Sequence, residues 1–233
     1  MRDKVDYMTR SVILVPSRTR PKRFVRAVDS LRQHSTVSDI VACLDEDDHA
    51  LYPRMQGVKY EIGPKPEQLG VNEKLNRMAN KYMDEYDYIL WAADDTTVMT
   101  PKWDENLINA IKDVPMGISY PDDLAQRALL PSNGTCFDSN IVKTLGYLAP
   151  PELLHLYIDN FWKLLGDAMQ TLRYCPEVIL EHHHYAVRKA PVDDLYSAIN
   201  SPWMYERDRN ALARYKMTNF QSDITKLKEA INK

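Results

Sequence analysis

Short apolar runs alternate with amphipathic stretches along the first half of the chain. Residues 11–15 form a continuous, β-branched run, which is typical of a strand buried in a parallel sheet. After a polar turn, apolar residues return from Phe24 onward with the spacing of one helix face. Further predicted strands cover residues 39–44, 58–62, 88–92 and 116–120. Strands that alternate with helices predict an α/β fold around a mostly parallel sheet.

The remaining segments predict helices and one late strand. A helix should open after Gly70 with Asn72 as its N-cap, and another should follow Pro101. Beyond Pro131 the pattern is less regular, with a helix predicted over 158–172 and a strand over 178–180.

The last part of the chain is charged and helical from about Trp203. Its apolar stripe is expected to dock on the domain, with self-association into a homo-oligomer as the alternative. The stripe consists of Phe220, Ile224, Leu227 and Ile231. We therefore predict one domain over residues 1–200 and a C-terminal helical extension over 201–233.

Composition narrows the classes of protein. The 233 residues carry a formal net charge of −3, which gives no global electrostatic case for a nucleic-acid or membrane partner. Three scattered cysteines without a CxxC pair argue against a disulfide framework and a cysteine zinc site. No apolar run approaches the ~20 residues of a membrane helix. The polar N-terminus has no signal-peptide region, so we expect a cytoplasmic protein.

Polar and charged residues follow three of the predicted strands. Ser17 and Arg18 follow the first strand, Asp45 follows the second, and Asp94 and Asp95 follow the strand over 88–92. In open α/β sheets, ligands bind beyond these carboxyl ends. Adjacent carboxylates repel each other unless a cation or hydrogen-bond donors neutralise them, and oxygen ligands suit Mg²⁺ or Mn²⁺. The acid pair predicts a divalent-cation site, the alternative being acids that cap the next helix.

A run of three histidines follows the last predicted strand. Alternation along an extended segment puts His182 and His184 on one face and turns His183 away. Three consecutive histidines therefore cannot all bind one ion, but one or two could complete a metal site as neutral imidazoles. The alternative is a histidine cluster that is exposed or satisfied by the core.

Several common motifs are missing. The sequence contains no GxGxxG, GxxxxGK[ST], HExxH or GxSxG. Their absence argues against a dehydrogenase, a P-loop NTPase, a zinc metalloprotease and an α/β-hydrolase.

The order of the remaining motifs is specific. Pro-Ser-Arg-x-Arg-Pro is followed by Asp45, by a Gly70…Lys74-Leu-Asn76 helix and by YILWAADD. Then come Pro101 with Trp-Asp, the segment NGTCF…LGYLAPPELLHLYIDNFW, the histidine run and Lys-Ala-Pro at 189–191. Over about residues 11–200 this order resembles GT-A glycosyltransferases, particularly small phage- and bacteria-encoded members. The resemblance implies a Rossmann-like sheet flanked by helices.

The resemblance also implies a nucleotide-binding set. Its members would line the nucleotide pocket, touch the base or ribose, or approach the ribose and diphosphate. They are Pro16, Ser17, Arg18, Asp45, Lys74, Asn76 and Asp94.

The resemblance further implies the metal ligands and the catalytic base. The chain has Asp-Asp-Thr where the family has Asp-x-Asp, so Asp95 would be the main metal ligand. His184 or His182 would be the late ligand of Mn²⁺ or Mg²⁺. Asp159 matches the position of the general base, which could take the proton of an acceptor hydroxyl. The alternative for Asp159 is an acid that interacts favourably with a helix N-terminus.

These residues predict a metal-dependent glycosyltransferase, inverting if Asp159 is the base. The donor would be a nucleotide-sugar, with a UDP-sugar as first choice. Rival hypotheses are a nucleotidyltransferase, which would want a glycine-rich loop after the first strand, and a non-catalytic nucleotide-sugar-binding protein. The acceptor is left open. One candidate acceptor is a modified base in phage DNA, and the local basic cluster at 18–26 is compatible with DNA binding. A phage-encoded protein would be expected in the host cytoplasm.

Overall fold

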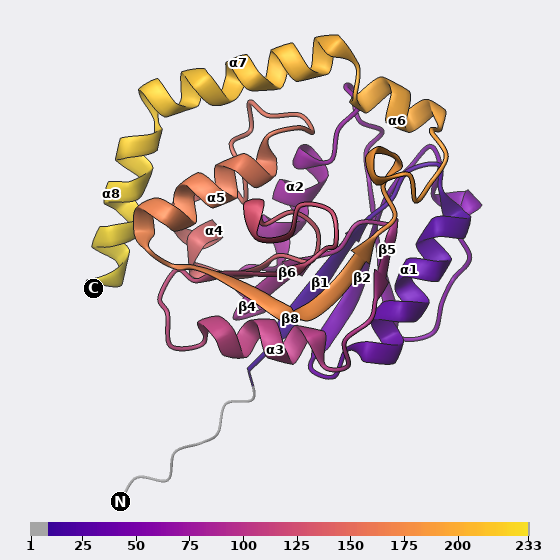
Figure 1. Ribbon diagram of the computed structural model, residues 1–233, viewed down its shortest axis with the longest axis horizontal. Coiled ribbons are helices and arrows are strands. Elements are labelled where there is room, and N and C mark those ends of the chain that lie inside the picture. Colours follow the sequence, from indigo (N-terminus) through magenta and orange to yellow (C-terminus); the bar gives the residue numbers. More distant parts are fainter. Residues whose placement is uncertain (1–8, 233) are drawn as a thin grey trace, which may run out of the picture.

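The computed structural model describes residues 9–232. Eight strands form a sheet in the order β3-β2-β1-β4-β7-β6-β8-β5 (Figure 1). The strands are β1 Ser11–Pro16, β2 Ser38–Asp45, β3 Val58–Gly63, β4 Tyr88–Trp91, β5 Thr96–Val98, β6 Ile118–Asp122, β7 Cys136–Asp138 and β8 Leu172–His182.

The first four strands of this order run parallel. Leu14 of β1 pairs with Val41 of β2 on one side and with Trp91 of β4 on the other. β7 lies antiparallel to both β4 and β6, β6 and β8 run parallel, and β5 pairs antiparallel with the end of β8. The mostly parallel α/β sheet expected from the sequence is confirmed.

Helices cover both faces of the sheet (Figure 1). Alternate residues of β1 point into two separate cores: Val12 and Leu14 pack with α2, α4 and α5, whereas Ile13 and Val15 pack with α1 and α3. This is why the apolar run at 11–15 has no polar face. The helices are α1 Pro21–His34, α2 Asn72–Tyr82, α3 Trp103–Ile111, α4 Asn140–Leu145, α5 Ile158–Met169, α6 Asp194–Ile199, α7 Pro202–Thr218 and α8 Phe220–Ile231, with single turns η1 His49–Leu51, η2 Arg127–Leu129 and η3 Tyr185–Val187.

Several boundaries differ from the prediction for local reasons. The helix expected over 158–172 ends at Met169, because Gln170 adopts a left-handed conformation with φ of 60° and the chain turns into β8. The strand expected over 178–180 is part of this longer β8. Asn72 is the first residue of α2 and not its cap, because its amide donates to the carbonyls of Pro150 and Leu153. The short β5, β7, α4 and α6 were not predicted.

The Trp-Asp pair at the start of α3 has a structural role. The Asp104 carboxylate is fully buried and accepts hydrogen bonds from the backbone N–H groups of Thr36, Val37 and Ser38. The Trp103 indole donates to the Ser35 hydroxyl at 2.8 Å. These contacts tie α3 to the chain that enters β2.

The two C-terminal helices pack on the domain. Ile224 and Leu227 of α8 are buried in the same core as α5, together with Ala211 and Tyr215 of α7. The docking expected for the apolar stripe is therefore confirmed for Ile224 and Leu227, with Phe220 partly buried, whereas Ile231 is exposed. Self-association and the boundary at residue 200 stay predictions. No helix among residues 9–232 combines the length and apolarity needed to cross a bilayer.

Candidate active site

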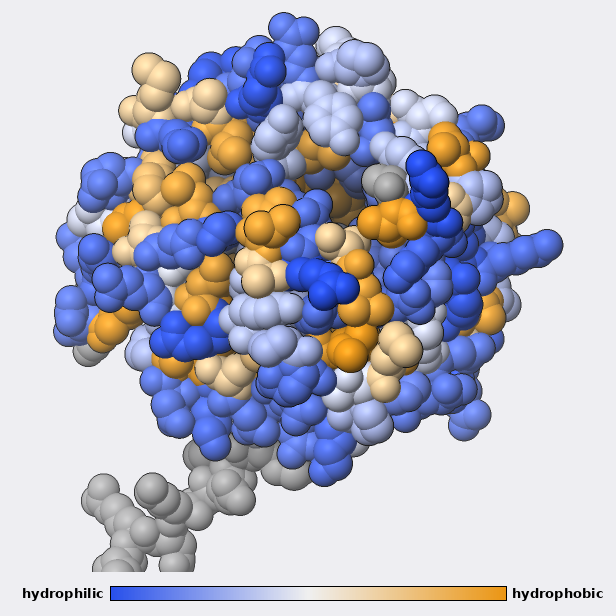
Figure 2. All heavy atoms as spheres, in the orientation of Figure 1, coloured by the Kyte–Doolittle hydropathy of each residue, from blue (hydrophilic) through white to orange (hydrophobic). Residues whose placement is uncertain are grey.

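A pocket of about 410 Å³ lies beyond the carboxyl ends of β1 and β4, between the starts of α2 and α5 and the segment that follows β8. Figure 2 shows the molecule hollowed on this face, with apolar residues visible in the hollow. The predicted site residues that line it are Pro16, Ser17, Arg18, Lys74, Asp94, Asp95, Asp159, His182 and His184. The structure thus brings together all the predicted residues except Asp45 and Asn76.

The acid pair after β4 is buried at the base of the pocket. Asp94 accepts a hydrogen bond from the Ser17 hydroxyl at 2.5 Å, and Arg20 Nη1 lies 3.7 Å from its other oxygen. Burial, followed by the adjacent charge of Asp95, raises the pKa of Asp94. Two carboxylates this close favour a cation between them or beside them.

One oxygen of Asp95 stands out. Oδ2 accepts a hydrogen bond from the Tyr196 hydroxyl, whereas buried Oδ1 accepts none from the described residues. His182 Nε2 lies 3.3 Å from Oδ1 without hydrogen-bond geometry, which leaves an electrostatic contact. A buried carboxylate oxygen without a donor is the kind of atom that a divalent cation would satisfy.

The histidines divide as strand alternation predicts. The ring centroids of His182 and His184 lie 5.1 Å apart, whereas His183 Nε2 makes a 2.9 Å hydrogen bond with the Thr97 hydroxyl. Burial, followed by the charge of His182, lowers the pKa of His184 to about 4, so its imidazole is neutral, as a metal ligand must be.

His182 has a different environment. Its Nδ1 lies 3.7 Å from Asp123, a residue that sequence reasoning missed. Burial opposes a positive charge here, but the carboxylates of Asp95 and Asp123 outweigh it and raise the pKa of His182 to about 9. Asp123 also accepts hydrogen bonds from the backbone N–H groups of residues 125, 126 and 127 and so shapes the loop after β6.

Charged residues near the carboxyl ends of β1 and β2 neutralise one another. Arg18 Nη1 and Lys74 Nζ each lie 2.9 Å from Asp45 Oδ2, and Arg18 also forms a two-point contact with Asp47. Asp45, Asp47 and Asp48 bring carboxylate oxygens within 4.8 Å of one another. Because Arg18 and Lys74 already balance Asp45 and Asp47, we interpret this cluster as an ion-pair network and not as a metal site.

Two of the predicted nucleotide-binding residues do not line the pocket. Asp45 is buried and does not line the pocket, because it holds the two cations that do. Asn76 lies outside the lining, and its amide bonds the backbone of Leu148 and Ala149. Both residues support the pocket from behind.

Asp159 lies at the start of α5 and faces the pocket. Its Oδ1 accepts the backbone N–H of Asn160 at 2.8 Å. Burial raises the pKa of its carboxyl. A carboxylate with a raised pKa is better matched to proton transfer near neutral pH than an ordinary surface acid.

The loop before Asp159 is fixed by a second residue that sequence reasoning missed. Asp208 of α7 is fully buried and accepts the backbone N–H groups of Leu154, His155 and Leu156 at 3.1, 2.9 and 2.8 Å. Tyr157 follows with φ of 63°, an unusual value for a bulky residue. The loop therefore has one defined shape at the edge of the pocket.

Comparison with solved structures identifies the fold. No protein-family model and no curated protein matches the sequence. Among solved structures, a mannosyltransferase from Pyrobaculum calidifontis in complex with GDP-mannose and Mn²⁺ superposes with a TM-score of 0.57 at 12% identity, covering 97% of this chain and 81% of that one. Glucosyl-3-phosphoglycerate synthase from Mycobacterium tuberculosis gives a TM-score of 0.62 at 15% identity, with 88% and 78% covered. The chain has the GT-A fold.

A third GT-A neighbour is the catalytic domain of Drosophila β1,4-galactosyltransferase 7, with a TM-score of 0.53 at 13% identity, covering 80% of this chain and 77% of that one. The fold expected from the motif order over 11–200 is thereby confirmed. At sequence identities this low, the structural similarity establishes the GT-A fold alone. The activity must be argued from the pocket.

Proposed function

We propose that this chain is a metal-dependent glycosyltransferase that moves a sugar from a nucleotide-sugar donor to an acceptor hydroxyl. The observation that carries the proposal is one GT-A pocket that holds a buried acid pair, two histidines on one side and a separate carboxylate at Asp159. Neighbours of the same fold were solved with Mn²⁺ and GDP-mannose, and with Mn²⁺ and UDP, which supports the assignment.

The residues around Asp95 fit a divalent cation. Asp95 Oδ1 has no hydrogen-bond donor among the described residues, and the neutral imidazole of His184 is close to the same carboxylate. Asp95 and His184 would hold Mn²⁺ or Mg²⁺, with His182 as an alternative ligand once it has lost its proton. When bound, the ion would stabilise the negative charge that develops on the departing diphosphate.

The nucleotide would occupy the end of the pocket formed by Ser17, Arg18 and Lys74. The two cations are held in place by Asp45, so a donor would meet a preorganised surface instead of mobile side chains. Asp94, fixed by Ser17, would approach the ribose. A UDP-sugar is the first donor to test.

Asp159 would act as the general base. Its carboxylate would accept the proton of the acceptor hydroxyl as that oxygen attacks the anomeric carbon from the side opposite the leaving group. The nucleoside diphosphate would leave with the bonding electrons of the broken C–O bond. Direct displacement of this kind inverts the anomeric configuration.

The test combines binding with product analysis. A thermal-shift panel of nucleotide-sugars with and without Mn²⁺ should identify a donor that stabilises the protein only with the metal. The stabilisation should disappear in Asp95→Ala and persist in Asp167→Ala, a control that removes an exposed carboxylate on α5. Release of a nucleoside diphosphate from this donor would support a glycosyltransferase.

Other products would contradict the proposal. Release of pyrophosphate from a nucleoside triphosphate and a sugar phosphate would indicate a nucleotidyltransferase. Stable donor binding without any nucleotide release, even to water, would indicate a binding protein. Mn²⁺-independent stabilisation in Asp95→Ala would remove the metal site from the proposal.

A further inference from the structure

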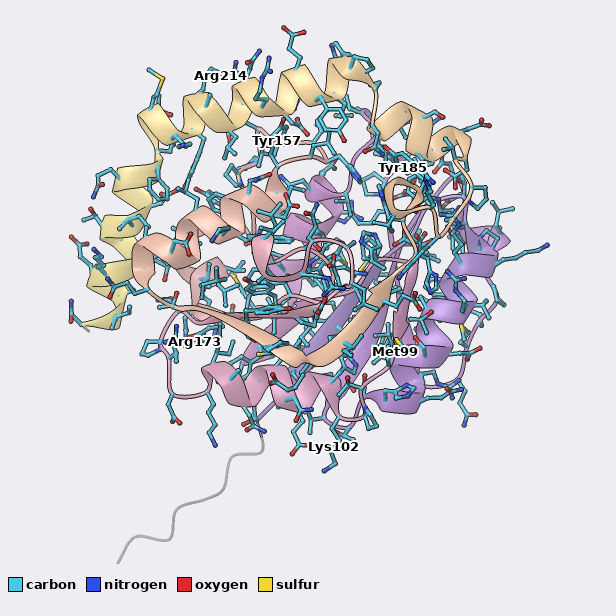
Figure 3. All side chains as sticks on the ribbon, viewed as in Figure 1. Met99, Lys102, Tyr157, Arg173, Tyr185 and Arg214 are labelled. Carbon is cyan, nitrogen blue, oxygen red and sulfur yellow. The ribbon has the colours of Figure 1, made fainter. Side chains whose placement is uncertain are left out.

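Three tyrosines from separate segments meet Asp159 in the pocket. Tyr157 precedes α5, Tyr185 opens η3 after β8, and Tyr205 lies in the first turns of α7; all three line the cavity with Asp159. Figure 3 shows Tyr157 and Tyr185 on two different loops on the side of the sheet that α7 covers. Burial raises the pKa of the Tyr205 hydroxyl, so this group is neutral and can both donate and accept a hydrogen bond.

Two of these rings are held in position by the protein. The Tyr185 ring centroid lies 4.4 Å from that of His184 and 5.0 Å from that of Tyr196. Tyr157 has a left-handed backbone, and the loop that leads into it is fixed by Asp208. An unfavourable backbone conformation that the surroundings maintain is typical of a ligand-binding residue.

Charge is distributed unevenly along the pocket. Within the described lining, the only lysine and arginine are Lys74 and Arg18, both at the nucleotide end and both paired with Asp45. The rest of the described lining includes aromatic rings, tyrosine hydroxyls and the amides of Gln126 and Asn200. The lining also contains His182, but its positive charge is balanced by the carboxylates of Asp95 and Asp123. Phosphate groups need cationic partners, and a nucleic acid or a phosphorylated acceptor finds no cation among the described lining residues that is not already paired with a carboxylate.

We infer that the Asp159 end of the pocket is an acceptor subsite for a neutral sugar ring, an inference that rests on the proposed glycosyltransferase function. One face of a pyranose presents C–H groups that pack on an aromatic ring, while its hydroxyls bond to polar groups at the edge. Tyr157, Tyr185 and Tyr205 supply such rings and hydroxyls beside the carboxylate that would take the acceptor proton. The acceptor is therefore an uncharged glycoside or glycan and not a DNA base.

The experiment measures nucleotide release from the donor, with Mn²⁺, in the presence of probe acceptors. The probes are methyl glycosides of common hexoses, neutral disaccharides, hexose phosphates and a single-stranded oligonucleotide. At least one neutral probe should accelerate release above donor hydrolysis to water, with a glycosylated product detectable by mass spectrometry. Acceleration by phosphorylated probes or the oligonucleotide alone would overturn the inference, as would hydrolysis that no probe accelerates.

Substitution locates the subsite. Tyr205→Ala should raise the KM of the neutral acceptor by roughly tenfold, the equivalent of about 1.4 kcal/mol of lost packing, while the Kd of the nucleoside diphosphate stays unchanged. Trp203→Ala is the matched control, because Trp203 is an exposed aromatic residue on the same helix outside the pocket lining, and its acceptor KM should equal that of the wild type. An unchanged KM in Tyr205→Ala would overturn the subsite. Absence of any donor binding would instead refute the proposed function.

Discussion

The carboxylate of Asp208 is expected to control both the stability of the fold and the position of Asp159, the proposed general base. In Asp208→Ala, the backbone N–H groups of Leu154, His155 and Leu156 lose their acceptor, and Arg207, whose Nη1 lies 2.5 Å from Oδ1, loses its partner. The shape of the loop before Asp159 depends on these contacts.

The magnitude follows from the number and burial of the contacts. A hydrogen bond to a charged group contributes about 1.5–3 kcal/mol, but the three N–H groups will partly find water when the loop relaxes. Removal of one partner of a buried ion pair costs about 3–5 kcal/mol, and we expect Asp208→Ala to fall in this range. Asp208→Asn keeps one accepting oxygen and should lose about 1–3 kcal/mol, the cost of the unsatisfied groups alone.

Urea unfolding and steady-state kinetics together check this prediction. The free energy of unfolding should fall in the order wild type, Asp208→Asn, Asp208→Ala, and acceptor-dependent turnover should fall in the same order while nucleotide affinity is kept. Glu206→Ala, an exposed acid on the same helix, is the control and should behave as the wild type. If Asp208→Ala loses no more stability than this control, the carboxylate does not hold the loop.

Three further predictions concern the pocket and the carboxylate of Asp123 beside it. His184→Ala should weaken Mn²⁺ binding measured by calorimetry by roughly tenfold or more, whereas His183→Ala should not, and equal losses would contradict the ligand assignment. Asp159→Asn should lower transfer by about 10²–10⁴ with donor affinity retained; transfer at the wild-type rate would place the base elsewhere. Burial opposes ionisation of Asp123, but the neighbouring His182 and the hydrogen bond donated by Ser132 outweigh it and lower the pKa of Asp123 to about 2. The contribution of the Asp123 carboxylate to the free energy of unfolding is therefore complete above about pH 4 and is lost as the pH falls through about 2. The difference in unfolding free energy between the wild type and Asp123→Asn should therefore narrow over this interval, and a constant difference would refute the linkage.

Much of the sheet could be predicted because its strands carry local signals. The run at 11–15 is apolar on both faces because β1 lies between two cores. The acids at Asp94 and Asp95 follow a strand whose carboxyl end reaches the pocket, so strand order alone indicated their position. The short β5 and β7 could not be predicted, since their pairing depends on partners distant in sequence.

The supporting residues of the site were harder to find. Asn76 occupies a position that the family resemblance associates with the nucleotide, but its amide faces a loop that only the tertiary structure brings alongside. The sequence does indicate a structural role for Asp208. It lies in line with Met204, Ala211 and Tyr215 on the buried face of α7, and an acid within an apolar stripe indicates a carboxylate with internal partners.

Loops shaped by distant carboxylates also constrain the order in which the molecule can assemble. Asp104 binds residues 36–38 from α3, and Asp208 binds residues 154–156 from α7, so each loop depends on a helix that follows it by more than fifty residues. A growing chain that has not yet reached α7 can already contain the strands and the acid pair. The segment that carries Asp159 has no acceptor for its amides until the last helices dock. We therefore expect the Asp159 end of the pocket to take its final shape late in folding, after the end that contains Ser17 and Lys74.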